Sequence, residues 1–284
     1  MNKVKQRRGS GHLAGNLAGN LAAAITRLPD VKSKERPALM THVVVGYPSL
    51  EESFDIIKIM AEMGVWAAEL QFPFSDPMAD GPTIMWANEE SLRGGTRIAD
   101  CFSLLKQLSA ETSMPIVPMT YFNLLAAAKQ GPAGFCKKVA AAGGEAIIVP
   151  DVPFDDKVEH FPQTAKDAGV SAIPLVSPVT GEKRMKLLSS LSDAEFVYCV
   201  STTGTTGARN NLPPGLPAYL KTVRRNFNRP LALGFGISAP EHIKALSGLA
   251  EIAIVGSATI DVIRNTRKQS RLSTMRGFLR KLLG

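Results

Sequence analysis

Two acidic residues in one short stretch of the chain have the types and spacing for acid–base chemistry. Glu69 ends an apolar, strand-like run, and Asp80 follows eleven residues later in a loop stiffened by Pro73, Pro77 and Pro82. Because this loop can fold back over the end of the strand, the two carboxyl groups can reach opposite sides of one small substrate. Such a pair suits proton transfer to and from that substrate. We therefore predict that Glu69 and Asp80 are catalytic.

Each of these carboxylates also has a plainer interpretation. Glu69 could form a structural ion pair with a lysine or an arginine. Asp80, followed by Gly81-Pro82, could form a turn or cap a helix over 83–93. We favour the catalytic interpretation for both residues. For Asp76, in the same loop, we favour the turn.

The elements that must position this pair alternate along the chain. Short β-branched or apolar runs are followed by longer segments with helical spacing. The predicted strands are 42–46, 66–71, 115–119, 145–150, 171–175, 196–200, 231–235 and 251–255. The predicted helices are 50–63, 97–109, 132–142, 155–168, 181–191, 216–227, 239–247 and two pieces within 256–283. This alternation predicts an α/β protein with a parallel sheet, because each helix carries the chain back along the sheet.

Eight strand–helix units in about 240 residues are typical of a closed (β/α)8 barrel. An open, doubly wound sheet is the alternative, but the turn after the first strand reads Val45-Gly46-Tyr47-Pro48-Ser49 and not GxGxxG. We expect residues 21–284 to form one barrel domain. Residues 1–20 form a basic, weakly ordered extension in this interpretation. A leucine stripe from Leu13 to Leu28 predicts an extra N-terminal helix, which Gly15 and Gly19 weaken.

The ends of the last two predicted strands favour phosphate binding. Gly234-Phe235-Gly236-Ile237-Ser238 and Gly256-Ser257-Ala258 are small-residue turns that each open a predicted helix. Glycine lets the backbone approach an anion, and a helix N-terminus offers unpaired N–H groups. The loops after the seventh and eighth strands frequently form a phosphate site in this kind of barrel. Turn geometry alone is the alternative explanation.

The segment 201–214, after the sixth predicted strand, is rich in threonine and contains Gly204 and Gly207. Small hydroxyl side chains with glycine hinges are typical of a mobile lid that closes on a substrate. Its stretch Gly204–Ala208 would close the phosphate site from that side. A plain surface loop is the alternative.

The charge distribution argues against several partners. Eleven of the 33 basic side chains but one of the 25 acidic side chains lie in residues 1–9 and 261–284. Basic ends of this kind are usual for solvated tails or helix faces, whereas nucleic-acid binding predicts a basic face with interleaved aromatic residues. The chain has no run of 18 apolar residues, the length of a membrane span. We expect neither a nucleic acid nor a membrane as a partner.

Cysteines and histidines are few and scattered. Cys101, Cys136 and Cys199 lack both the paired spacing of a zinc site and the even count of a disulfide framework, so we expect reduced thiols in a cytoplasmic protein. The four histidines include no HxxxH or HxH pair, which argues against a metal site. The predicted chemistry is therefore carboxylate-driven proton transfer on a phosphorylated substrate, without a metal or an organic cofactor.

Taken in order, these motifs resemble the α subunit of tryptophan synthase. Glu69-Leu70 followed by Pro73–Ile84 resembles that family's signature nearly letter for letter. Further similar motifs span about residues 38–265 in the family's order: Val45-Gly46-Tyr47-Pro48, Met119-Thr120-Tyr121-Phe122-Asn123, Val149-Pro150-Asp151-Val152-Pro153, Thr206-Gly207-Ala208, Gly234-Phe235-Gly236-Ile237-Ser238 and Gly256-Ser257-Ala258.

The resemblance implies retro-aldol cleavage of indole-3-glycerol phosphate to indole and glyceraldehyde 3-phosphate in tryptophan biosynthesis. It implies that Glu69 delivers a proton to indole C3 and helps remove one from the glycerol hydroxyl. Asp80 would bind the indole N–H and stabilise the positive charge that develops there. The implied substrate contacts are Tyr121, Tyr198, Thr206 and Phe235, and the implied phosphate contacts are Gly207, Gly236, Gly256 and Ser257.

Members of this family pair with a β subunit that carries pyridoxal phosphate. The resemblance therefore implies an α2β2 complex and no cofactor in this chain. Several positions depart from the family's pattern. Gln71-Phe72 replaces an expected small-then-aliphatic pair, His42 replaces an apolar residue expected against the indole, and Thr202 replaces a common arginine.

Three other functions stay open at this point. The chain could be a stand-alone lyase that releases free indole, because the lid and the pocket depart from the family's pattern. It could be another phosphate-binding barrel enzyme, such as an isomerase. It could also be a non-catalytic regulator that binds through its basic ends.

Overall fold

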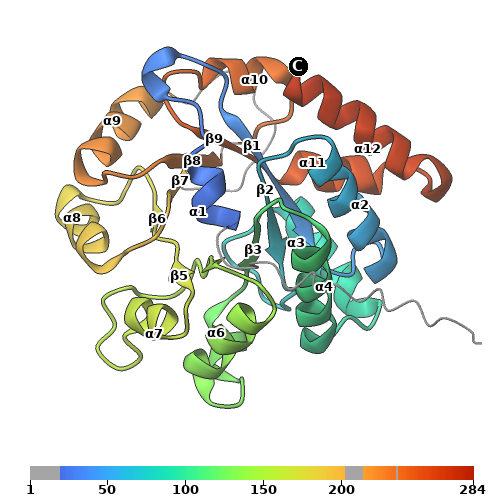
Figure 1. Ribbon diagram of the computed structural model, residues 1–284, viewed down its shortest axis with the longest axis horizontal. Helices are drawn as coiled ribbons and strands as arrows, with labels where there is room; N and C mark the ends of the chain where they lie inside the picture. The colour runs from blue at the N-terminus through green and yellow to red at the C-terminus, as the bar shows by residue number, and fades with distance from the viewer. Residues whose placement is uncertain (1–19, 202–213, 235) are drawn as a thin grey trace, which may run out of the picture.

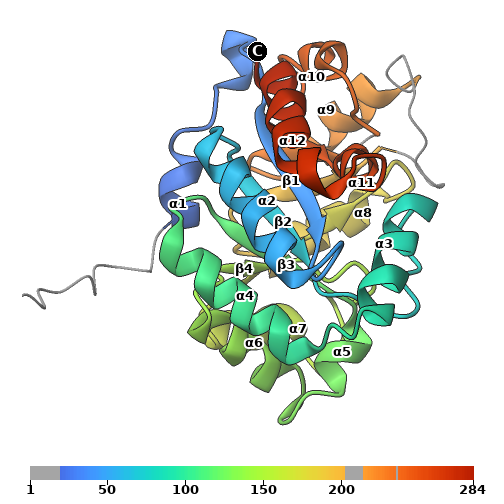
Figure 2. The same ribbon diagram turned by 90° about the vertical axis from the view of Figure 1, so that its right-hand side faces the viewer.

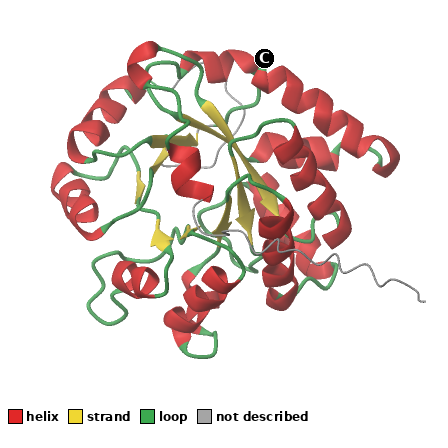
Figure 3. Cartoon of the chain, viewed as in Figure 1, coloured by secondary structure: helices red, strands yellow, loops and turns green. Residues whose placement is uncertain are grey.

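Parallel strands form the inner ring of the structure, and helices surround them (Figures 1 and 3). The computed structural model describes residues 20–201, 214–234 and 236–284. The strands in this part of the chain are β1 (Ala38–Val44), β2 (Ala67–Gln71), β3 (Ile116–Met119), β4 (Ala146–Ile147), β5 (Ser171–Ala172), β6 (Leu175–Val176), β7 (Val197–Val200), β8 (Leu231–Gly234) and β9 (Ile252–Val255).

The strand order confirms the predicted (β/α)8 barrel. Seven strands follow the order β3-β2-β1-β9-β8-β7-β6, β4 pairs with β5, and every pair is parallel. A bridge between Met119 and Ile148 joins β3 to β4. The strands β5 and β6 are the two halves of the predicted strand 171–175, which is interrupted before Leu175 at Pro174. Proline has no N–H group to donate to the ladder, and this explains the break.

The helices lie outside the strands and fill most of the predicted ranges. They are α2 (Leu50–Glu62), α3 (Pro82–Arg93), α4 (Ile98–Glu111), α5 (Phe122–Ala126), α6 (Gly131–Ala141), α7 (Phe161–Asp167), α8 (Glu182–Leu191), α9 (Leu216–Asn226), α10 (Pro240–Ala245), α11 (Ser257–Arg264) and α12 (Lys268–Leu283). The prediction of a helix over 155–168 was wrong in its first half. His160, just before α7, has a positive φ of 45°, a conformation that a continuous α-helix excludes.

The extra N-terminal helix is present as α1 (Asn20–Ile25) and closes the bottom of the barrel. Leu21 and Ala24 are buried there. The N–H groups of Asn20 and Leu21 donate to the carboxylate of Glu145 at 2.9 and 3.1 Å, an anion at a helix N-terminus. Figure 2 places α1 and α3 at opposite ends of the barrel. The rest of the leucine stripe and the extension 1–19 lie outside the described residues.

Alternation along β2 explains how a polar site arises in an apolar barrel. Ala68 and Leu70 belong to the apolar layer between the strands and the helices. Ala67 belongs to the separate cluster that fills the barrel interior. Successive side chains point to opposite faces of a strand, so Glu69 and Gln71 share the interior face with Ala67. The interior is therefore apolar at the amino ends of the strands and polar towards their carboxyl ends.

In the part of the chain that the structure describes, no helix is both long enough and apolar enough to span a membrane. The three cysteines are free and buried.

Candidate active site

The predicted catalytic glutamate lies inside the barrel, next to a histidine. His42 pairs with Glu69 in the register of β1 and β2. Glu69 is 2% exposed, His42 3% and Gln71 0%. Asp80 lies in the loop between β2 and α3 and is half-buried. Strand alternation and the β1–β2 register thus place three polar side chains on one interior face, and the loop brings Asp80 to them.

A continuous chain of polar contacts connects the two predicted catalytic carboxyl groups. The His42 ring places Nδ1 3.3 Å from Glu69 Oε1 and Nε2 2.8 Å from Gln71 Oε1. The Gln71 amide Nε2 then donates to Asp80 Oδ2 at 2.6 Å. On the other side of Glu69, the Tyr198 hydroxyl donates to Oε2 at 3.4 Å. The prediction that the loop folds back towards the strand end is therefore confirmed.

Glu69 and Asp80 line one cavity at the carboxyl ends of the strands. Residues from β1, β2, β3, β6, β7, β8 and β9 and from the segments after β2, β4, β8 and β9 surround it. The lining residues are His42, Glu69, Ala79, Asp80, Gly81, Ile84, Met119, Ile148, Pro150, Leu175, Tyr198, Val200, Gly234, Gly236, Ile254, Gly256 and Ser257. The cavity thus combines two carboxyl groups, an apolar wall that suits a flat ring, and a glycine-lined wall.

Three of the four predicted phosphate residues lie on the glycine-lined wall. Gly236 follows β8, Gly256 lies between β9 and α11, and Ser257 is the first residue of α11. Gly236 has a φ of 65°, which glycine adopts without strain. The first turn of α11 begins at Ser257, and the N–H groups of such a turn have no acceptor within the helix. Gly207, Thr206, Phe235 and Thr202 lie outside the described residues, as does most of the predicted lid.

The two predicted tyrosines take different places. Tyr198 lines the cavity next to Glu69. Tyr121 is 1% exposed and lies behind the loop, where its hydroxyl accepts the N–H of Ala79 at 3.2 Å. Its ring stacks on Phe74 with the ring centres 5.2 Å apart. Tyr121 therefore holds the Asp80 loop in place.

The loop is also tied to the helix that follows it. The side-chain oxygen of Asn88, on α3, accepts the N–H of Phe74 at 3.0 Å, and its amide nitrogen donates to Ile84 O at 2.9 Å. Pro82 occupies the first turn of α3, where its fixed φ suits a helix start. Asp76 is exposed at the surface, in agreement with its interpretation as a turn residue.

The electrostatics of the cluster favour bound protons. Burial raises the pKa of Asp80, although the His42 charge and hydrogen bonds from Gln71 and Tyr121 lower it. Burial lowers the pKa of His42, but attraction to Glu69 and Asp80 and the hydrogen bonds outweigh this effect and raise it overall. Burial raises the pKa of Tyr198 well above its usual value, so its hydroxyl stays protonated. A carboxyl group whose pKa is raised by burial binds its proton more tightly than one in water.

The contact between His42 and Gln71 was not predicted from the sequence. Both residues stood out as departures from the family's pattern, but their contact depends on the pairing of β1 with β2. The signal was the alternation on each strand, which puts Gln71 on the same face as Glu69. Among the described residues, no group of three or more His, Cys, Asp and Glu side chains is placed to hold a metal ion.

Fold and site together define a class of protein: a (β/α)8 barrel with an acid–base cavity at the carboxyl ends of its strands. Residues 28–280 match the family model described as tryptophan synthase alpha chain. The tryptophan synthase alpha chain of Desulforapulum autotrophicum is 40% identical over 227 residues, which cover 80% of this chain and 88% of that protein. That of Roseiflexus castenholzii is 36% identical over 255 residues, 89% of this chain and 96% of that protein. This chain belongs to the tryptophan synthase alpha chain family.

Solved structures agree with this assignment. A structure of the tryptophan synthase a2b2 complex from Pyrococcus furiosus contains a chain that is 30% identical, with a TM-score of 0.80, and covers 88% of this chain and 99% of that one. A chain of Mycobacterium tuberculosis tryptophan synthase is 29% identical with a TM-score of 0.80, covering 92% and 96%. The resemblance stated from the sequence is confirmed.

Proposed function

We propose that this chain cleaves indole-3-glycerol phosphate to indole and glyceraldehyde 3-phosphate, as the α subunit of a tryptophan synthase. One observation carries the proposal: Glu69 and Asp80 line the same cavity as Gly236, Gly256 and Ser257. A substrate with an aromatic ring at one end and a phosphate at the other matches this arrangement. The reaction class is a carbon–carbon lyase.

The proposed reaction begins with protonation of the ring. Glu69 gives its proton to indole C3, and the positive charge that develops at the ring nitrogen is stabilised by the Asp80 carboxylate. The Glu69 carboxylate then takes the proton of the glycerol hydroxyl on the carbon attached to C3. The bond between that carbon and C3 breaks, its electrons return to the ring, and an aldehyde forms. Glu69 ends the cycle protonated, so no net proton is consumed.

The chain's other residues would bind and orient the substrate. Apolar side chains such as Ile84 and Ile254 flank the place for the ring. The backbone at Gly236, Gly256 and Ser257 would bind the phosphate through N–H groups and the positive end of the α11 dipole. Gly207, Thr206 and Phe235 are proposed contacts from the sequence. Tyr198 would orient Glu69 through its hydroxyl, and Tyr121 would orient the loop that carries Asp80.

A β subunit is the proposed partner, and pyridoxal phosphate would belong to that subunit alone. The similarity to a chain of an a2b2 complex supports the pairing. Met78, in the Asp80 loop, is 88% exposed, and we propose that this loop is part of the surface that faces the β subunit. We propose a cytoplasmic location, which agrees with three free, buried thiols.

The test is to incubate the purified chain with indole-3-glycerol phosphate and to measure indole and glyceraldehyde 3-phosphate. We expect both products in equal amounts, and faster release when a β subunit is added. Release that no β subunit stimulates would favour a stand-alone lyase. No release from the chain alone or with a β subunit, although the chain is folded, would overturn the proposal.

A further inference from the structure

His42 and Gln71 make the only link between Glu69 and Asp80 that the described contacts provide. Its three contacts, at 3.3, 2.8 and 2.6 Å, run from the Glu69 carboxyl through the imidazole and the amide to the Asp80 carboxyl. Both linking side chains are buried, so bulk water cannot replace these contacts. A buried polar group without a partner is costly, so each hydrogen in this chain needs a defined position.

The donors and acceptors along the chain fix those positions. An ionised Asp80 only accepts, so it takes the NH2 group of Gln71. The amide oxygen of Gln71 then faces His42 Nε2, which must carry a hydrogen. A neutral His42 therefore presents a bare Nδ1 to Glu69. That contact is favourable only when Glu69 is protonated, or when His42 itself is charged.

When Asp80 is protonated, every hydrogen bond along this chain of contacts runs in the opposite direction. Asp80 then donates to the Gln71 oxygen, and the Gln71 NH2 group faces His42 Nε2, which becomes the acceptor. A neutral His42 carries its hydrogen on Nδ1 and donates it to an ionised Glu69. The same atoms thus support two states, in which one of the two acids holds the proton and the other does not.

We propose that His42 and Gln71 are positioning residues that couple the two acids, so that Glu69 is protonated when Asp80 is ionised. This inference rests on the proposed function for its meaning, because that state is the one in which Glu69 can protonate the ring while Asp80 stabilises it. The pairing of β1 with β2 brings these two residues into contact.

The surroundings contain few other groups that could decide the proton positions. Glu69 and Gln71 on β2, Asp80 in the next loop and Tyr198 on β7 face His42 or its partners. Tyr121 approaches Asp80 from behind the loop. From the side of β9, Gly256 packs against His42. Burial raises the pKa of both tyrosines, so they act as neutral donors.

The test uses the full chain with 15N-labelled histidine and does not depend on turnover. The ring nitrogens of His42 are assigned by their loss in His42→Asn. At pH 8 we expect the hydrogen on Nε2 in the wild type. In Gln71→Met, which keeps the length of the side chain but not its amide, we expect the hydrogen to move to Nδ1. The hydrogen on Nδ1 in the folded wild type, or identical titrations in wild type and Gln71→Met, would overturn the proposal.

A kinetic arm separates positioning from a merely structural role. In Gln71→Met we expect kcat for indole release to fall by about tenfold to a hundredfold with KM little changed, because the acid is misplaced or wrongly protonated. The acid limb of the pH–rate profile should also move.

His42→Asn keeps a polar group near the position of Nδ1, and His42→Phe does not. Higher activity in His42→Asn than in His42→Phe therefore supports the proposal. A pH profile identical in all variants contradicts it. If even the wild type releases no indole, the proposed function fails, while the 15N spectra still decide whether the link exists.

Discussion

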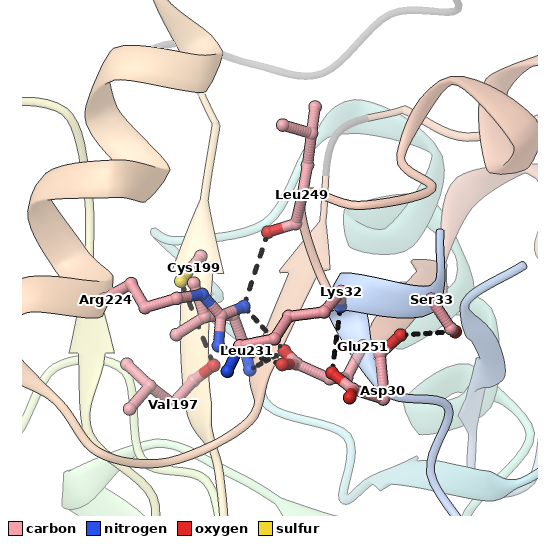
Figure 4. A network of polar contacts seen from close by, with 9 residues as sticks. All are labelled: Asp30, Lys32, Ser33, Val197, Cys199, Arg224, Leu231, Leu249 and Glu251. Carbon is pink, nitrogen blue, oxygen red and sulfur yellow. Dashed lines mark hydrogen bonds and ion pairs between the residues drawn. The ribbon is translucent and has the colours of Figure 1, made fainter. Parts of the chain in front are cut away.

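Two buried glutamates, one at each end of the barrel, show what separates a structural carboxylate from a candidate catalytic one. Glu251 precedes β9, at the amino ends of the strands, and is 8% exposed. Its two oxygens accept hydrogen bonds from Arg224, each at 2.8 Å, and one also accepts the N–H of Leu231 at 2.8 Å (Figure 4). Arg224 donates further to the carbonyl oxygen of Leu249 at 3.5 Å. This carboxylate has a permanent cation as its partner.

Glu69 is also buried, at 2% exposed, but its partners are a histidine and a tyrosine hydroxyl. Histidine changes charge near neutral pH, whereas arginine does not. Glu69 also lines a cavity, towards the carboxyl ends of the strands where barrel active sites lie. A structural ion pair with an arginine was the alternative interpretation of Glu69. In the described part of the structure, Glu251 forms such a pair and Glu69 does not. Burial alone does not indicate function, and the identity of the partner does.

The largest loss of activity is expected for Glu69→Gln, which keeps the shape of the side chain but cannot donate or accept the proton as a carboxyl group does. We expect kcat/KM for indole release to fall by about 10³-fold, as for the loss of a general acid. The urea midpoint should change little, because an amide can still bond with His42 and Tyr198. If this variant is instead active but much less stable, Glu69 is structural and its contrast with Glu251 disappears.

The next largest effect is expected for Asp80→Asn. Removing the anion that stabilises the charged ring should lower kcat by about 10²-fold. Because burial raises the pKa of Asp80, the ionised carboxylate is unfavourable in the folded state, and the variant should be at least as stable as the wild type near neutral pH. Steady-state kinetics and thermal unfolding of the same preparation measure both quantities. If Asp80→Asn lowers the free energy of unfolding by as much as it raises the activation free energy, Asp80 is a structural carboxylate like Glu251.

The sequence identified both catalytic candidates and most of the barrel because these features are local. Glu69 and Asp80 belong to one strand and its following loop, and prolines mark that loop. Seven of the predicted strands coincide with observed strands to within a few residues. The eighth, 171–175, contains its own break at Pro174, which was visible in the sequence.

What the sequence could not provide depends on contacts between distant segments. The bridge between β3 and β4, the closure of the barrel by α1 and the ion pair of Arg224 with Glu251 each join parts that no local pattern relates. The contact of His42 with Gln71 is of this kind, since it requires the register of two strands. The short helix α5 has too few residues to show a helical period.

A smaller effect is expected for Glu251→Gln, and it appears in stability. The change leaves Arg224 without its counter-ion, and because the Arg224 side chain is 35% exposed, water replaces part of the interaction. We expect a loss of about 2 kcal/mol in the free energy of unfolding, below the range for fully buried pairs. Turnover by the folded enzyme should stay unchanged.

As a control, Glu62→Gln breaks the exposed pair with Arg276 and should change the free energy of unfolding by less than about 1 kcal/mol. Equal effects at the two positions would mean that the Glu251 network adds nothing beyond a surface pair.

The smallest effect concerns the dependence of stability on pH. The pKa of His42 is raised above its unfolded value of 6.5, so the folded state binds this proton more tightly than the unfolded state does. The resulting stabilisation is complete below pH 6.5 and is lost as the pH rises through the folded pKa. The raised pKa of Asp80 likewise stabilises the folded state at low pH, and this contribution is lost as the pH rises above the unfolded value of 3.8.

Urea unfolding of wild type and His42→Asn from pH 6 to 9 should therefore give a difference in the free energy of unfolding that shrinks with increasing pH. A difference that grows with pH would mean that the folded state binds the His42 proton less tightly than the unfolded state does, contrary to the raised pKa of His42.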